Sequence, residues 1–239
     1  MSGINEKKKR NWKNITGYFL FVVLLISIAY TIVRIIMAPS ELTVSDAHVK
    51  IKSDYVLMLI QCILGLIVMM IPSIVERRLS IDIPNNMEVL YFIFLFCAIY
   101  LGEVRDFYYL IPYWDTILHA FSGAMLGALG FWLVSFLNDA SYINLKLSPF
   151  FVAMFAFCFA LAAGAAWEIY EFTFDGLLSL NMQKHTLKNG IPLVGREALE
   201  DTMKDIIVDA VSAFAVSTTG YYQLLKQEMC DTKDIDSML

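Results

Sequence analysis

The chain has 239 residues, of which 58% are hydrophobic and only 17% are charged, and its mean hydropathy is +0.61. A soluble globular domain has about 45–50% apolar and about 25% charged residues, so this composition excludes an ordinary soluble domain. The formal net charge of −5 argues against a protein that binds nucleic acid. We expect membrane lipid as the partner, and the composition leaves the oligomeric state open.

The hydrophobic residues gather in six long blocks, and a block of about 18 or more apolar residues can cross the hydrocarbon core of a bilayer. This pattern predicts an all-α fold, an integral membrane bundle of about six transmembrane helices. A basic amino terminus (1–14) precedes the transmembrane domain (15–225), and an acidic tail (226–239) follows it. The blocks are expected, in chain order, at about 15–37, 55–75, 87–101, 114–137, 149–178 and 201–225.

The first block follows a basic run, Lys7–Arg10, as a secretory signal would. Its apolar stretch exceeds the roughly 7–15 residues of a signal core, so an uncleaved span is predicted. Lys7–Arg10 and the pair Arg77–Arg78 fall on the same side of the membrane, which the distribution of basic residues assigns to the cytoplasm. Six spans then place both termini in the cytoplasm. Four basic residues near the opposite side depart from this rule: Lys184, Lys188, Arg196 and Lys204.

Acidic residues and one histidine recur at helical spacing in the last three blocks. Residues three or four positions apart share one face of a helix. Because neighbouring spans run in opposite directions, the start of the fourth block, the end of the fifth and the start of the sixth lie at one level, near the outer surface. The three stripes are Asp115 and His119; Glu168, Glu171 and Asp175; and Asp201, Asp205 and Asp209.

Ionised groups at membrane depth persist where they face partners, water or a cation. Carboxylates and imidazole are ligands for divalent metals, and they also serve as general acids and bases. A cap on a helix amino terminus explains Asp115 and Asp201 without any function, but it does not explain Glu168 or Glu171 near a carboxyl end. We expect a metal site of Asp115, His119, Glu168, Glu171, Asp205 and Asp209, catalytic roles for His119, Glu168 and Glu171, and a rim of Asp175, Asp201, Arg105 and Arg196. Apart from a divalent metal ion, no cofactor is indicated.

Four ordered motifs in the second half of the chain resemble those of a known family. They are Trp114-Asp115-x-x-Leu118-His119, Ser122-Gly123, Trp167-Glu168-x-x-Glu171 and Asp201-Thr202-x-x-Asp205. Over the third to sixth blocks the chain resembles the YjdF-like bacterial inner-membrane family of unknown function. This resemblance implies a multi-pass protein of the bacterial plasma membrane and supplies no established activity.

A looser resemblance is to VanZ-like membrane proteins, which carry an Asp…His helix, a Glu-bearing helix and an Arg…Asp helix. VanZ itself is linked to glycopeptide-antibiotic tolerance. Arg196 with Asp201 or Asp205 would take the place of the last pair here. Asp209 stands where asparagine is usual, and this departure counts against transferring the antibiotic role.

Three functions remain open from the sequence. The first is a cation-dependent site, in an enzyme or a binding protein, that acts on a lipid or envelope precursor at the outer leaflet. The second is a proton- or cation-coupled transporter, which is disfavoured because the first three blocks show no matching inner cluster and no helix is broken at mid-membrane. The third is a structural or partner-binding protein in which the charged groups form an ionic clasp.

Overall fold

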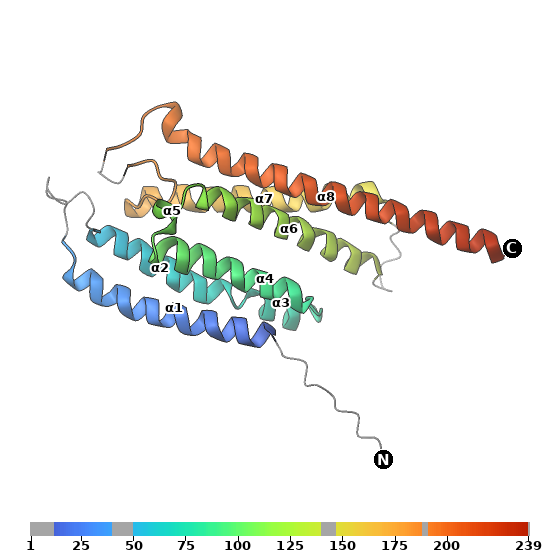
Figure 1. Ribbon diagram of the computed structural model, residues 1–239, viewed down its shortest axis with the longest axis horizontal. Helices are drawn as coiled ribbons and strands as arrows, with labels where there is room; N and C mark the ends of the chain where they lie inside the picture. Colours follow the sequence, from blue (N-terminus) through green and yellow to red (C-terminus); the bar gives the residue numbers. More distant parts are fainter. Residues whose placement is uncertain (1–11, 40–49, 140–146, 188–190, 239) are drawn as a thin grey trace, which may run out of the picture.

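The computed structural model describes residues 12–39, 50–139, 147–187 and 191–238, and the basic run Lys7–Arg10 lies outside these ranges. The described residues form helices joined by short connections, and they contain no strand, only one isolated bridge between Thr186 and Pro192. The helices lie roughly side by side in an elongated bundle (Figure 1). The predicted all-helical fold is therefore confirmed.

Five helical stretches among the described residues are long and apolar enough to cross a membrane. They are α1 (Trp12–Met37), α2 (Lys52–Val68) with α3 (Ile71–Leu79), α4 (Asn85–Leu95) with the π-helix η1 (Phe96–Val104), α6 (Trp114–Asp139) and α7 (Pro149–Leu178). A short helix, α5 (Phe107–Leu110), joins η1 to α6. These stretches agree with the first five predicted blocks.

The sixth block lies within α8 (Arg196–Met238), which begins before the predicted span and continues through the acidic tail. Its 43 residues carry more charge than the other long helices, and it does not qualify as a span by composition. Even so, α8 runs beside α6 and α7 (Figure 1). A sixth crossing by α8 stays a prediction.

The second block is interrupted, contrary to the expectation of unbroken helices. α2 ends at Val68, and α3 begins at Ile71 with Pro72 in its first turn. A proline has no backbone N–H and cannot continue the hydrogen-bond ladder of the preceding helix. The third block also departs from a regular α-helix, because η1 is wound as a π-helix, a form frequent near functional sites.

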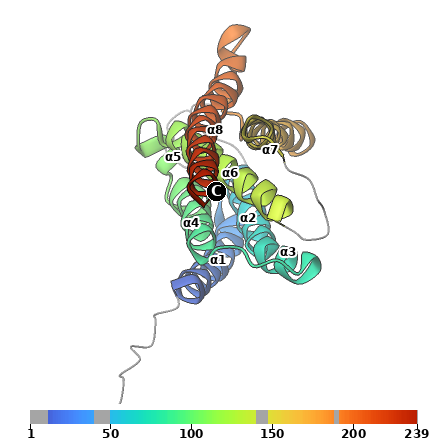
Figure 2. The ribbon, with the colours of Figure 1, turned by 90° about the vertical axis from the view of Figure 1, so that its right-hand side faces the viewer.

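Two regions pack in different ways. In the amino-terminal region (α1 to α4 with η1), large apolar side chains form a core of Leu20, Leu24, Cys62, Phe92, Leu95 and Ile99. In the carboxy-terminal region (α6 to α8), the fully buried positions include Ala156, Ala160 and Ala213, so these helices approach closely. α6 lies between the α7–α8 pair and the helices of the amino-terminal region (Figure 2).

A group of ion-paired side chains lies at one end of the amino-terminal region. The Lys13 ammonium pairs with the carboxylates of Glu76, at 3.2 Å, and of Glu88, which is 1% exposed. These three residues come from the starts of α1 and α4 and from α3, at the end of the bundle where α1 begins. This ion-paired group, of which only Glu88 lies inside one of the first three predicted blocks, was not predicted from the sequence. Glu88 was read as part of an apolar block, and nothing in its spacing pairs it with Lys13.

Candidate functional site

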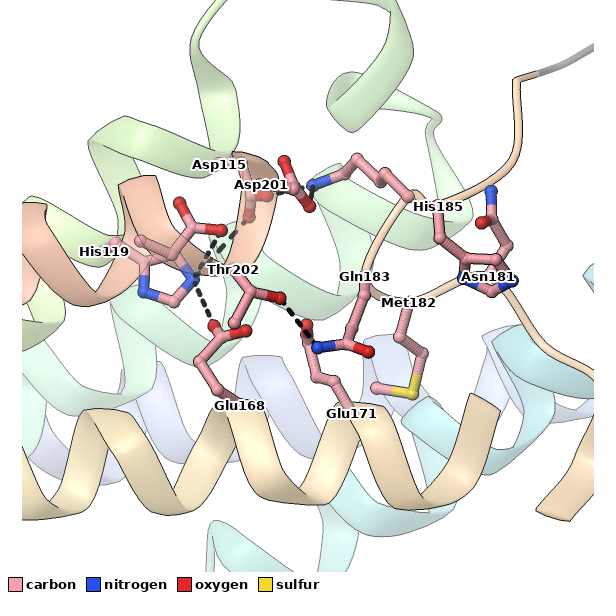
Figure 3. Close-up of polar contacts among 12 residues, drawn as sticks. Asp115, His119, Glu168, Glu171, Asn181, Met182, Gln183, His185, Asp201 and Thr202 are labelled. Atoms are coloured by element: carbon pink, nitrogen blue, oxygen red, sulfur yellow. Dashed lines mark hydrogen bonds and ion pairs between the residues drawn. The ribbon is translucent and has the colours of Figure 1, made fainter. Parts of the chain in front are cut away.

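The imidazole of His119 on α6 lies at the centre of four carboxylates. Its Nδ1 is 3.2 Å from Asp209 Oδ2, on α8. Its Nε2 faces the other way and lies 4.0 Å from Asp115 Oδ1, 3.8 Å from Glu168 Oε1 and 3.8 Å from Asp205 Oδ2. We call these five residues the histidine–carboxylate cluster, and the end of the bundle that holds them the cluster end. Figure 3 shows Asp115 and Glu168 of this cluster facing His119.

The directions of α6, α7 and α8 bring the cluster residues of these three helices to the same end of the bundle. α6 and α8 both start at the cluster end, and α7 finishes there. α7 begins with Pro149 behind a Ser148 cap, whose hydroxyl accepts a hydrogen bond from the Phe151 backbone N–H at 3.3 Å. Spacings of four residues on α6 and on α8 then stack Asp115 with His119 and Asp205 with Asp209.

Asp209 is enclosed by two glycines from the neighbouring helices. A Cβ atom added at Gly164 of α7 would lie 2.9 Å from Asp209 Cγ, and one added at Gly123 of α6 would lie 2.9 Å from the Asp209 backbone oxygen. The Ser122 hydroxyl donates to Asp209 Oδ1 at 3.4 Å. The carboxylate is thereby held against His119 by close packing as well as by a hydrogen bond.

Four of the five cluster residues are buried, Asp115 is partly exposed, and Glu168 has few polar partners. Glu168 is 4% exposed and Asp209 is 1% exposed, and His119 and Asp205 are buried too. Among the described residues, neither oxygen of Glu168 accepts a short hydrogen bond; His119 Nε2 lies 3.8 Å away, and the Thr202 hydroxyl is a further polar neighbour. A buried carboxylate without close donors is costly, because it has lost its hydration without replacement.

A connecting segment between α7 and α8 covers the cluster. Its Lys184 side chain forms an ion pair with Asp115 and lies 3.7 Å from Asp201 Oδ2. Gln183 of the same segment donates a hydrogen bond to the Thr202 hydroxyl at 2.7 Å (Figure 3). Burial by itself would lower the pKa of Lys184, but the charges of Asp115 and Asp201 outweigh it, and the pKa is raised above its ordinary value.

Asp175, predicted at the rim, anchors this segment instead of facing the cluster. Its two carboxylate oxygens accept hydrogen bonds from the backbone N–H groups of Met182, at 2.8 Å, and Gln183, at 3.0 Å. His185 Nδ1 also lies 3.4 Å from it. These contacts hold Lys184 in position above Asp115.

The remaining predicted residues lie around the cluster. Glu171 accepts a hydrogen bond from the Trp167 indole at 2.9 Å, and Asp201 faces Lys184. Arg105 and Arg196 are exposed, and in the part of the chain that the structure describes no ion pair joins either of them to the cluster. The structure thus brings Asp115, His119, Glu168, Asp205 and Asp209 together and leaves both arginines apart.

Sequence reasoning missed Lys184 and Gly164 as parts of this site. Lys184 was noted only as a basic residue on the side where few are expected, and that exception was the signal that could have found it. Gly164 lies inside the fifth hydrophobic block, and its contact with Asp209 depends on which helix α7 faces. Ser122 stood in a quoted motif without a role.

A cavity of about 210 Å³ extends from the cluster into the bundle. At the cluster end its wall includes Asp115, His119, Glu171 and Lys184. Further in, the wall is apolar and comes from both regions of the bundle, including Leu57, Leu64, Val68, Phe94, Leu95, Ala98, Ile99, Leu126 and Ala163. The cavity therefore joins a charged end to an apolar interior.

The fold and this site define a multi-pass membrane protein with a buried histidine–carboxylate cluster. Residues 20–226 match the model of a family described as "Predicted membrane protein (DUF2238)", and the chain belongs to this family. An uncharacterised protein of Thermotoga maritima is 25% identical over 156 residues, which cover 63% of this chain and 69% of that protein. No solved structure matches the chain.

Proposed function

We propose that the histidine–carboxylate cluster binds one divalent cation through His119 Nε2, Asp115 and Asp205, with Glu168 as a fourth ligand. One observation carries this proposal: the Asp209 carboxylate lies on Nδ1 of His119, while Nε2 faces the other carboxylates. Metal-binding histidines are oriented in this way, by a carboxylate on the ring nitrogen that does not bind the metal. The ligand atoms of Asp115, His119 and Asp205 lie within 4.8 Å of one another.

The charges of the site support the same proposal. Four carboxylates surround one imidazole, and the nearby cation Lys184 pairs with Asp115 and Asp201. A divalent ion would offset this excess and give Glu168, which accepts no short hydrogen bond, a close partner. One nitrogen and three carboxylate ligands suit manganese, iron or zinc better than calcium, which prefers oxygen ligands alone. Asp209, first predicted as a ligand, is here the group that orients His119.

We further propose that the protein acts on a lipid or envelope precursor at the outer face of a bacterial plasma membrane, with both termini in the cytoplasm. The YjdF-like resemblance and the basic residues at Arg77–Arg78 support this placement. Glu171 lines the cavity next to the cluster without belonging to the metal ligands, so it is the candidate general base. The VanZ-like resemblance stays a prediction.

Metal analysis of the detergent-purified protein tests the cation site. We expect the wild type to hold about one equivalent of Mn²⁺ or Zn²⁺ after dialysis. Asp205→Asn removes a ligand charge with little change of shape and should weaken binding at least tenfold, because a directly bound carboxylate is lost. The matched control is Glu200→Gln, which removes an exposed carboxylate on the same helix and should leave metal content unchanged.

Folding is monitored in parallel by thermal unfolding in detergent. Added Mn²⁺ or Zn²⁺ should raise the unfolding temperature of the wild type and of Glu200→Gln, since a ligand that binds only the folded state stabilises it. Absence of both stoichiometric metal and a metal-dependent shift in the wild type overturns the proposal.

A second function, a cation-coupled transporter, is favoured by one feature of the fold. Val68, the last residue of α2, lines the cavity directly before the interruption at Met69–Met70, and interrupted helices often border transport sites. Proteoliposomes with a trapped Mn²⁺- or pH-sensitive dye distinguish the two functions. A signal that depends on Asp205 supports transport, whereas metal binding without flux supports the first proposal.

A further inference from the structure

The cavity is elongated along the bundle. Four residues of α2 line it, Leu57, Gln61, Leu64 and Val68, and they recur every three or four positions. They therefore cover one face of the helix over roughly 16 Å, at about 1.5 Å per residue. Since α2 belongs to a membrane-spanning stretch, this direction is that of the hydrocarbon chains of a bilayer.

The two ends of the cavity differ in chemistry. Gln61, which donates to the Met182 sulfur, Ser122 and the carboxylate of Glu103 are polar members of the cavity wall, and the rest of the wall away from the cluster consists of aliphatic and aromatic side chains. The cluster end combines carboxylates and His119 with the ammonium of Lys184 and the tyrosines Tyr108 and Tyr109. Lys184 lies 5.0 Å from the centre of the Tyr108 ring, so the cationic donor is held on the side of the cavity formed by α5.

The volume limits what can enter. At about 210 Å³ the cavity is smaller than the roughly 300–1,000 Å³ typical of sites for drug-sized ligands. An elongated apolar space of this size accommodates one hydrocarbon chain and excludes the body of a two-chain lipid. The occupant must also carry a head group that suits carboxylates and an ammonium together.

The geometry points to a single-chain membrane amphiphile with a phosphate head group, whose chain lies between α2, η1 and α6 and whose phosphate lies at the cluster. This inference rests on the proposed cation site, because a metal ion held by Asp115, His119 and Asp205 would let a phosphate approach the carboxylates. The Lys184 ammonium then provides a second positive charge on the phosphate. An amine head would instead bind the carboxylates directly and need no metal.

Two alanines that line the cavity permit a test that leaves the cluster residues in place. Ala163 on α7 and Ala98 on η1 line the cavity from different helices, whereas Ala162, the neighbour of Ala163, is exposed. Phenylalanine at either lining position would fill the space intended for the chain. The variants Ala163→Phe and Ala98→Phe are compared with the matched control Ala162→Phe, so that one badly folded variant does not decide the result.

The probe is dodecyl phosphate, and its binding is measured by native mass spectrometry of protein released from maltoside micelles, with and without Mn²⁺. We expect one bound dodecyl phosphate on the wild type with Mn²⁺, at least tenfold weaker binding to both lining variants, and no change in Ala162→Phe. Mn²⁺ content should stay the same in all three alanine variants, whereas Asp205→Asn should lose both Mn²⁺ and the amphiphile.

Dodecylamine is the competing probe. Equal binding of dodecylamine without Mn²⁺, or equal occupancy by dodecyl phosphate in the wild type and both lining variants, overturns the assignment. If the wild type takes up no Mn²⁺, the proposed cation site is wrong. The measurements without Mn²⁺ then test separately whether the cavity binds the amphiphile. If the wild type binds dodecyl phosphate without Mn²⁺ and Ala98→Phe does not, the cavity and its Lys184 contact are supported as the binding site. If the wild type binds no dodecyl phosphate either, the assignment of the cavity is overturned as well.

Discussion

The two regions of this bundle bury different kinds of side chains. The amino-terminal region is held by leucine, isoleucine and phenylalanine around α1, α2 and α4, and its buried charge lies at the end remote from the cluster, where Lys13 pairs with Glu88. The carboxy-terminal region buries alanine and glycine at its helix contacts and places a histidine and four carboxylates among them. Small side chains let three helices approach one polar site, which large ones would keep apart.

The difference shows how polar groups are retained in a membrane bundle. In lipid, apolar burial gives little drive for helices to associate, so close packing and polar contacts matter more. The amino-terminal region relies on close packing, and the ion pairs of Lys13 with Glu76 and Glu88 link the ends of its helices. The carboxy-terminal region uses glycine contacts to fix Asp209 on His119, and the same contacts both stabilise the fold and orient the site.

The largest change in stability is expected from Lys13→Ala in the amino-terminal region. The substitution leaves the buried Glu88 carboxylate without its cation. The free energy of unfolding should fall by about 3 kcal/mol, which is at the low end of the range for removing one partner of a buried ion pair. Chemical denaturation in mixed micelles measures it, and Mn²⁺ affinity should not change.

Lys204→Ala is the control for Lys13→Ala, because it breaks an exposed ion pair with Glu200 and should have almost no effect on stability. The double variant Lys13→Met, Glu88→Met should recover most of the loss, since no buried carboxylate is left unpaired; Glu76 also loses Lys13, but it is partly exposed and keeps a hydrogen bond from the Ile83 backbone N–H. An equal loss of stability in Lys13→Ala and Lys204→Ala would show that the buried pair of Lys13 with Glu88 does not stabilise the fold.

Gly164→Ala should disturb both stability and the site. The added methyl group meets the Asp209 carboxylate, and overpacking of this kind costs about 1–3 kcal/mol. Displacement of the group that orients His119 should also weaken Mn²⁺ binding by about 10–100-fold. Isothermal titration in detergent measures this affinity.

Gly176→Ala lies on the same helix, where an added Cβ meets no atom within 4 Å. It should leave Mn²⁺ affinity unchanged and stabilise α7 slightly, because alanine is the better helix former. Unchanged Mn²⁺ affinity in a folded Gly164→Ala protein would show that close packing against Gly164 is not required for Asp209 to orient His119.

The smallest effect, and the one with opposite sign, is expected from Lys184→Met. Removal of the ammonium that pairs with Asp115 frees a ligand and deletes a like charge near the metal, so Mn²⁺ should bind roughly fivefold more tightly, or about 1 kcal/mol. Dodecyl phosphate should bind less tightly to the same variant, because its second positive partner is gone. Parallel loss of both ligands would indicate that Lys184 serves only to fold the segment above the cluster.

Much of the fold could be predicted because hydrophobic blocks of spanning length are a local property of the sequence. The limits of α7 were predicted at Pro149 and Leu178, and α1 and α6 ended close to their predicted bounds. The interruption at Met69–Met70 was not predicted, although Pro72 is visible, because a proline inside an apolar block can also be carried by a kinked helix.

For the site, the sequence by itself determined which faces of α6, α7 and α8 carry acidic residues, since helical spacing follows from the chain alone. Only the tertiary structure decided the role of each one. Asp209 lies at Nδ1 and Asp205 at Nε2 of the same imidazole because Gly123 and Gly164 let three helices close on one level, and Asp175 is used to anchor the segment that carries Lys184. Contacts between residues far apart in the chain depend on how helices rotate and approach, and no local pattern records that rotation.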